Sequence, residues 1–95
     1  MALQDIQNEH TRRSILLALA ALNYTSNDSV IKDSCELFGN AMSSDQVRTQ
    51  LGWLAEQGLV TIERKTSYMI ATLTSRGQDV ANGRSFVDGV KRPSA

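Results

Sequence analysis

The chain is nearly without cysteine and histidine, and this scarcity excludes several kinds of site. Its single cysteine, Cys35, cannot form a disulfide within the chain, and such cysteine usage is typical of a reducing compartment, so we expect a cytoplasmic protein. The single histidine, His10, and Cys35 cannot supply the four ligands of a closed zinc site. The sequence contains no recognisable Ser-His-Asp set and no glycine-rich loop that could bind a phosphate. We therefore expect no metal, no cofactor and no catalysis.

Long hydrophobic runs are also missing. The longest, "SILLALAAL" at 14–22, is shorter than the roughly 20 apolar residues that cross a bilayer. It follows two arginines and contains Ala18-Leu19-Ala20, so it resembles the apolar region and cleavage site of a signal peptide. Cleavage there would remove a helix that so small a core needs. We therefore expect no signal peptide and no membrane partner.

Net charge is absent as well. Ten basic residues balance ten acidic ones, whereas nucleic-acid binders are often basic, so a nucleic-acid partner would require the positive charges to cluster. The hydrophobic fraction of 41% and the charged fraction of 21% are those of an ordinary globular domain. Ninety-five residues are enough for one such domain.

The first half of the chain predicts two helices. Apolar spacing indicates a helix from Glu9 to Leu22, preceded by a flexible lead-in at 1–8 and followed by a polar break at 23–28. A second helix is expected to begin at Asn27 or Asp28, because either residue can cap it, and to end at Gly39-Asn40. The residues expected on its buried face are Val30, Ile31, Ser34, Leu37 and Phe38.

The third helix, 43–57, has the clearest signals. Ser43 and Gln46 have the spacing of a capping box, and Gly58 is a typical helix stop. The spacing of three residues places them on one buried stripe: Val47, Leu51 and Leu54. Met42 is expected to pack against this helix as a hydrophobic staple, and Trp53 on its side is more typical of partly buried packing than of a base-stacking platform.

The pattern then changes to strands. Residues 59–63 and 68–73 are rich in Val, Ile, Thr and Tyr and predict an antiparallel hairpin, whose loop at 63–67 has no Gly, Asn or Asp for a tight turn. Thr74 or Ser75 is expected to cap a short helix over 75–82. The domain therefore spans 9–83. The tail, 84–95, carries Phe86, Val87 and Val90, which are expected to dock on the body or on a second subunit.

This order, α-α-α-β-β-α, is that of a helix-turn-helix followed by a hairpin. The stretches "SSDQVRTQLGWLAEQGLV" and "ATLTSRGQDVANG" resemble the capped helix and the strand-to-helix junction of the winged-helix DNA-binding superfamily. The chain looks most like small MarR- or ArsR-type bacterial regulators, although it lacks the paired cysteines of the metal-sensing ArsR-type members. The tail "GRSFVDGVKRP" is similar to small winged-helix proteins of Mu-like bacteriophages.

The resemblance implies an α+β fold in which helix 43–57 reads duplex DNA and the wing at 63–67 contacts its backbone. Arg48 can pair with a guanine edge or a phosphate, Gln46 with adenine, and Thr49 with a phosphate or a thymine methyl. Asp45 and Glu56 share the outward arc and oppose DNA binding, because carboxylates repel phosphates. The expected DNA-binding residues are Ser44, Gln46, Arg48, Thr49, Arg64, Lys65, Thr66 and Arg76.

Two classes of function remain open. The first is a transcriptional regulator that binds double-stranded DNA as a homodimer through the first helix and the tail. The second is a winged-helix module that binds another protein and never touches DNA, since a fold does not determine a function. Zero net charge and the two acidic residues of the third helix, Asp45 and Glu56, are consistent with this second function.

Overall fold

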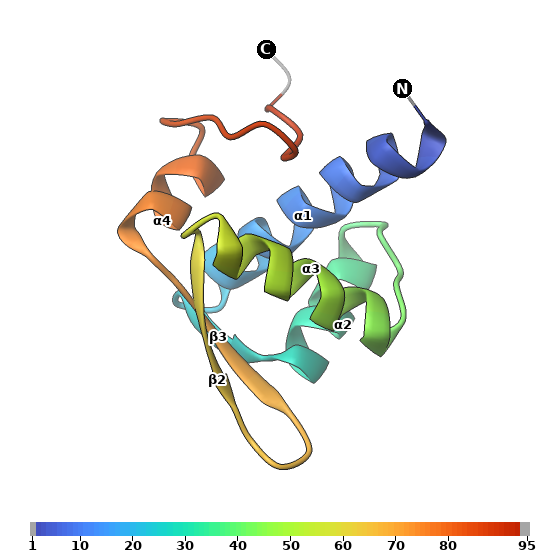
Figure 1. Ribbon diagram of the computed structural model, residues 1–95, viewed down its shortest axis with the longest axis vertical. Helices are drawn as coiled ribbons and strands as arrows, with labels where there is room; N and C mark the ends of the chain where they lie inside the picture. The colour runs from blue at the N-terminus through green and yellow to red at the C-terminus, as the bar shows by residue number, and fades with distance from the viewer. Residues whose placement is uncertain (1, 94–95) are drawn as a thin grey trace.

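The protein is described from a computed structural model, which covers residues 2–93. About half of these residues are helical, and the rest of the regular structure is one three-stranded antiparallel sheet, which makes the fold α+β (Figure 1). In chain order the elements are α1 (Leu3–Ala21), β1 (Thr25–Asn27), α2 (Asp28–Leu37), α3 (Ser44–Glu56), β2 (Val60–Arg64), β3 (Met69–Leu73) and α4 (Ser75–Ala81).

The core lies between the helices and one face of the sheet. Helix α1 is central, and it contacts α2, α3, α4 and β3. Its buried side chains include Ile15, Leu16 and Leu19. The predicted stripe of α3, formed by Val47, Leu51 and Leu54, is confirmed, because all three side chains are fully buried in this core.

Helix α1 is longer than the sequence predicts. It begins at Leu3 rather than at Glu9, so residues 3–8 are helical, and the expectation of a lead-in without regular structure is wrong for them. Residues 2–7 are all exposed, which explains the error: no apolar stripe facing the core marks these turns. Residue 1 and residues 94–95 lie outside the described part of the chain.

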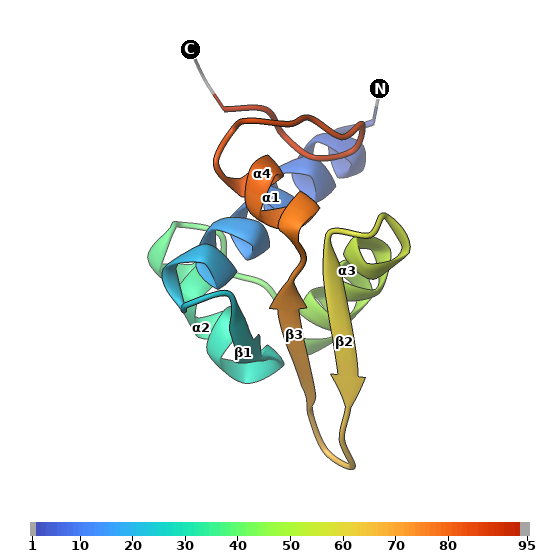
Figure 2. The same ribbon diagram turned by 90° about the vertical axis from the view of Figure 1, so that its left-hand side faces the viewer.

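A short strand replaces part of the predicted polar break. After α1, Asn23 and Tyr24 adopt positive φ angles of 63° and 76° and turn the chain back. Strand β1 then pairs antiparallel with β3, which lies between β1 and β2 (Figure 2). The hydroxyl oxygens of Thr25 and Thr72 lie 2.9 Å apart across this ladder. Strand β1 was not predicted because its partner lies far away in the sequence.

Helix α2 begins where predicted, but the side chains that it turns towards the core differ from the predicted ones. The side chain of Asn27 caps it by accepting a 2.9 Å hydrogen bond from the Val30 amide. The expected buried face is wrong for Val30, Leu37 and Phe38, which are 40%, 88% and 52% exposed. The residues that face the core are Asp28, Ile31 and Cys35.

The capping box of α3 is confirmed. The Ser43 hydroxyl accepts from the Gln46 amide at 3.1 Å, and the Gln46 side chain accepts from the Ser43 amide at 2.8 Å. Met42 and Val47 are both buried, as the predicted staple requires. Trp53 packs partly buried against the core, as expected.

The hairpin and the short last helix also agree with the sequence. Strands β2 and β3 pair from Val60↔Leu73 to Arg64↔Met69, and no tight two-residue turn joins them. Thr74 caps α4 by accepting a 3.0 Å hydrogen bond from the Gly77 amide. Figure 1 shows the hairpin projecting at one end of the molecule, while the described ends of the chain lie at the other.

The tail docks on the body of its own chain. Val90 is buried, and the Lys91 amide donates to the carbonyl of Glu9 at 3.2 Å. The Arg12 guanidinium lies 3.8 Å from the centre of the Trp53 ring and donates to the Gly89 carbonyl at 3.0 Å. Burial lowers the pKa of Arg12, and the nearby acids of α1 act in the opposite direction.

Candidate nucleic-acid interface

The outward face of α3 begins directly at its cap. Ser44, Asp45 and Thr49 are exposed, whereas Val47 and Leu51 on the opposite side are fully buried. Since α3 is held from behind by its apolar stripe, the exposed residues of its first half form a rigid row. This row can approach a partner without any rearrangement of the core.

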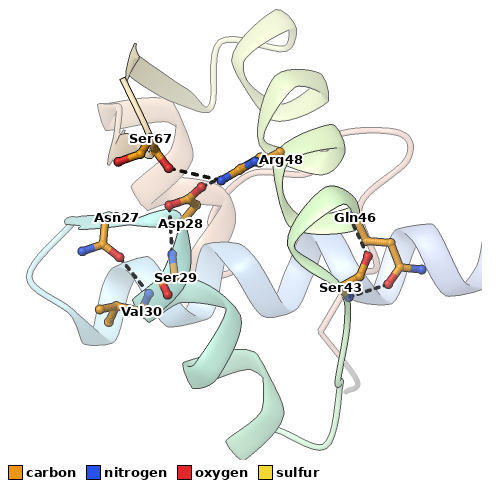
Figure 3. A network of polar contacts seen from close by, with 8 residues as sticks. All are labelled: Asn27, Asp28, Ser29, Val30, Ser43, Gln46, Arg48 and Ser67. Atoms are coloured by element: carbon orange, nitrogen blue, oxygen red, sulfur yellow. Dashed lines mark hydrogen bonds and ion pairs between the residues drawn. The ribbon is translucent and has the colours of Figure 1, made fainter. Parts of the chain in front are cut away.

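Gln46 is exposed but already engaged. Its side-chain oxygen accepts from the Ser43 amide, so the side chain folds back over the helix start (Figure 3). To contact an adenine edge it would have to leave this position, which would cost the helix part of a cap that is typically worth about 1 kcal/mol. The geometry therefore weakens the predicted role of Gln46 in base contact.

Arg48 is engaged more strongly. Its Nε donates to the Asp28 carboxylate at 2.8 Å, and its Nη2 lies 3.5 Å from the Ser67 carbonyl (Figure 3). The Asp28 side chain is only 7% exposed, and its other oxygen accepts from the Ser29 amide at 3.0 Å. Arg48 thus connects α3 to the start of α2 and to the hairpin loop (residues 65–68), while 43% of its side chain remains open to solvent.

A cleft separates α3 from the hairpin loop, and its lining is basic. This hairpin cleft has a volume of about 290 Å³ and is lined by Arg48 on one side and by residues 64–69 on the other. Arg64, Lys65 and Thr66 are all exposed. Glu63 forms a 2.9 Å ion pair with Lys65, and this hydrogen bond raises the pKa of Lys65. Arg64, the solvent-exposed side of Arg48 and the loop hydroxyls can bind a phosphate group, whereas Lys65 is already paired with Glu63.

Arg76 does not belong to this cluster. Its Nη1 donates to the carbonyl of Gln57 at 2.9 Å, at the carboxyl end of α3. Since Arg64 pairs with Met69 at the far end of the ladder, about five residues of strand, or roughly 17 Å, separate it from Arg76. Arg76, one of the expected DNA-binding residues, therefore lies apart from Arg64 and Lys65 and instead satisfies a carbonyl at the end of α3.

A second hollow borders α3 on its other side. It has a volume of about 320 Å³ and lies between the first half of α1, the α2–α3 connection and the start of α3. Its lining is rich in amide side chains, namely Gln4, Gln7, Asn8, Asn40, Gln46 and Gln50. Sequence reasoning missed these α1 residues because it treated residues 1–8 as a lead-in. The one signal for them is the run of glutamine and asparagine before Glu9.

Cys35 and His10, the two residues considered for a zinc site, differ in their exposure to solvent. Cys35 is fully buried, and this burial raises the pKa of its thiol to about 11, which favours the unreactive protonated form. His10 is exposed on α1. Within residues 2–93, no group of three or more His, Cys, Asp or Glu side chains is placed to hold a metal ion. No helix in this range is long and apolar enough to span a membrane.

Taken together, the fold and this surface define a small α+β domain in which a capped helix lies beside a basic hairpin cleft. No protein-family model matches the chain. The chain is 48% identical over 91 residues to the uncharacterized protein gp26 of Escherichia phage Mu, covering 96% of this chain and 95% of the phage protein. An uncharacterized protein of Haemophilus influenzae is 43% identical over 77 residues, 80% of this chain and 76% of the relative. The chain belongs to the family of these phage and bacterial proteins.

Proposed function

We propose that this protein binds double-stranded DNA as a winged-helix regulator in the cytoplasm. The observation that carries the proposal is the hairpin cleft, which is lined by Arg48 of α3 and by Arg64 and Lys65 of the hairpin. The strand order β1-β3-β2 and the pair α2 and α3 ahead of the hairpin support a winged-helix arrangement, with α3 as the recognition helix and the hairpin loop as the wing.

In this proposal the two sides of the interface have different tasks. Ser44 and Thr49 in the first half of α3 contact base edges or nearby phosphates in the major groove. Arg48, held by Asp28, contributes its exposed side to a backbone phosphate rather than to a guanine edge. Arg64 at the end of β2 and Thr66 of the wing contact the same stretch of backbone, and each contact adds affinity without sequence choice.

The test is a fluorescence anisotropy titration of the protein into labelled duplex DNA at several salt concentrations, with duplexes selected from a random pool. Arg64→Ala should weaken binding to all duplexes alike and reduce the salt slope by about 1, because one phosphate contact is lost. Arg84→Ala is the matched control: it removes the same charge from an exposed position in the segment after α4, and Figure 1 shows this segment at the end of the molecule opposite the hairpin loop. Absence of salt-dependent binding to any duplex would contradict the proposal.

A second function is favoured by specific charges. Asp45 and Glu56 are exposed on α3, and Glu63 neutralises Lys65 at the hairpin. A surface that carries both signs suits a protein partner better than a phosphate backbone. If wild type and Arg64→Ala both fail to bind duplex DNA at low salt, the protein-interaction reading replaces the regulator.

A further inference from the structure

Helix α1 carries a second stripe on the side away from the core. Leu3, Ile6, His10, Arg13 and Leu17 follow one another at alternating steps of three and four residues. This is the spacing of positions a and d in a helix that packs along another helix. The core face of α1, which includes Thr11, Ile15 and Ala18, lies on the opposite side by the helical period. The stripe therefore plays no part in the core of its own chain.

The first turns of this stripe are exposed to an unusual degree. Leu3 is 85% exposed and Ile6 is 42% exposed, and Figure 1 shows the start of α1 extending beyond the rest of the molecule. Phe38, 52% exposed, lies beside His10 across a shallow hollow and widens the apolar surface. Helical turns without tertiary packing are marginal in water, and clustered exposed apolar side chains usually mark a contact surface.

We propose that a second copy of the chain covers this stripe, with the two α1 helices antiparallel and a two-fold axis at His10. The stripe is self-complementary in this register. Leu3 lies opposite the partner's Leu17 and His10 opposite its own counterpart, while Ile6 lies beside the partner's Arg13, displaced by one residue or about 1.5 Å along the axis. A two-fold contact of this kind uses the same patch on both subunits and closes the assembly at a dimer.

Charge selects the antiparallel direction. Glu9 lies beside the stripe on the same flank as Arg13. In the antiparallel register the partner's Arg13 is displaced from Glu9 by two residues, or about 3 Å along the axis. Opposite charges thus meet twice, symmetrically. A parallel register would instead place Arg13 against its own counterpart. Among residues 2–93 the observed ion pairs do not include Arg13, so it is available for this contact.

The tail contributes less to this dimer than its sequence suggests. Val90 is 6% exposed, and Val87 packs against the core of its own chain. Only Phe86 of its three apolar side chains remains exposed, at 53%. The contact between copies is therefore carried by α1 with Phe38 beside it, and it does not depend on whether the chain binds DNA.

Sedimentation or light scattering at about 100 µM tests the dimer, since oligomerisation depends on protein concentration. Wild type should have twice the mass of one chain, which is 10.4 kDa. Ile6→Glu should give a single chain whose helical circular dichroism falls by no more than the first turns of α1 contribute, because these turns lose their packing. Val30→Glu is the matched control, because Val30 is 40% exposed on α2, and it should remain dimeric. His10→Leu should lower the dissociation constant at least tenfold, as expected for an apolar residue at a seam position.

Cysteine cross-linking tests the register. Under mild oxidation His10→Cys should form a disulfide dimer on a non-reducing gel, because only the residue on the two-fold axis meets its own counterpart. Leu3→Cys should not, because its counterpart lies about 21 Å away along the helix. The buried thiol of Cys35 does not interfere. A monomeric wild type, or Leu3→Cys cross-linking as readily as His10→Cys, overturns the inference. A monomer that still binds duplex DNA would overturn the dimer alone and leave the proposed function standing.

Discussion

The ion pair between Arg48 and Asp28 matters more to the nearly buried Asp28 than to the partly exposed Arg48. Asp28 is nearly buried and needs its partner, whereas Arg48 is 43% exposed and can be solvated without it. We expect Arg48→Ala to lower the free energy of unfolding by about 1–3 kcal/mol, since a buried acceptor loses its charged donor. Urea denaturation followed by circular dichroism measures this change.

The control for this substitution is Arg64→Ala, which removes an exposed arginine of the hairpin and should change stability by less than about 0.5 kcal/mol. Equal stability of Arg48→Ala and wild type would show that the ion pair contributes nothing. The comparison also separates two effects on DNA binding. Loss of affinity in Arg64→Ala reports a lost contact, whereas loss in Arg48→Ala also includes the loosened α2–α3 junction.

Cys35 makes stability depend on pH in the alkaline range. Its thiol has a pKa of about 11 in the folded protein, raised by burial from 9.0. Between these values the unfolded chain loses the thiol proton first, so unfolding becomes more favourable as pH rises. We expect the stabilising contribution of the protonated Cys35 thiol to be fully present below pH 9.0 and to be lost as the pH rises towards about 11. Urea midpoints from pH 8 to 10.5 measure it, with Cys35→Ala as the control that lacks this slope.

At the scale of elements, α3 contains a glycine that its packing does not require. A Cβ at Gly52 would meet no atom within 4 Å, and the residue lies in the helix interior. Gly52→Ala should therefore stabilise the protein by about 0.5–1 kcal/mol, because alanine loses less backbone entropy in a helix. The measurement is the urea midpoint.

Gly77 in α4 provides the opposite case. A Cβ there would collide with the backbone of Leu59, and backbone cannot move aside as a flexible side chain can. Gly77→Ala should lower stability by at least about 1 kcal/mol, as overpacking of a tight contact does. Gly52→Ala should raise the urea midpoint and Gly77→Ala should lower it. A shift of both midpoints in the same direction would contradict the assignment of these effects to the different surroundings of the two glycines.

At the scale of the whole molecule, the tail is part of the folded body rather than an appendage. It reaches α1 through Lys91 and through the hydrogen bond from Arg12 to the Gly89 carbonyl, and at Gly89 it lies against Trp53 of α3. Truncation after Gly83 should lower stability by about 1.5–3 kcal/mol for the lost burial of Val90 alone. Thermal unfolding and the emission wavelength of Trp53 measure the effect.

The matched control replaces an exposed side chain of the same segment. Phe86→Ala should leave the emission of Trp53 unchanged, because Phe86 is 53% exposed and stacks with Arg92 instead. A truncated chain as stable as wild type would support the predicted boundary of the domain at residue 83. A red-shifted emission would instead place the tail within the folding unit.

The local features of this protein were determined by its sequence. The caps at Asn27, Ser43 and Thr74 close within three residues, and the buried stripe of α3 repeats every three or four. The hairpin likewise pairs neighbouring segments. Such interactions need only the residues beside them, so propensity and periodicity predict them well.

Tertiary structure alone decided the features that join distant parts of the chain. Strand β1 pairs with β3, where Thr25 meets Thr72, 47 residues later, and Asp28 on the buried face of α2 pairs with Arg48, 20 residues away. The same ion pair holds Arg48, a side chain that the sequence predicts to contact DNA. Arg76 likewise does not join the cationic residues of the hairpin cleft, because its side chain donates to a carbonyl at the end of α3. Long-range partners depend on how all the elements pack, and a single stretch of sequence carries no local signal of that packing.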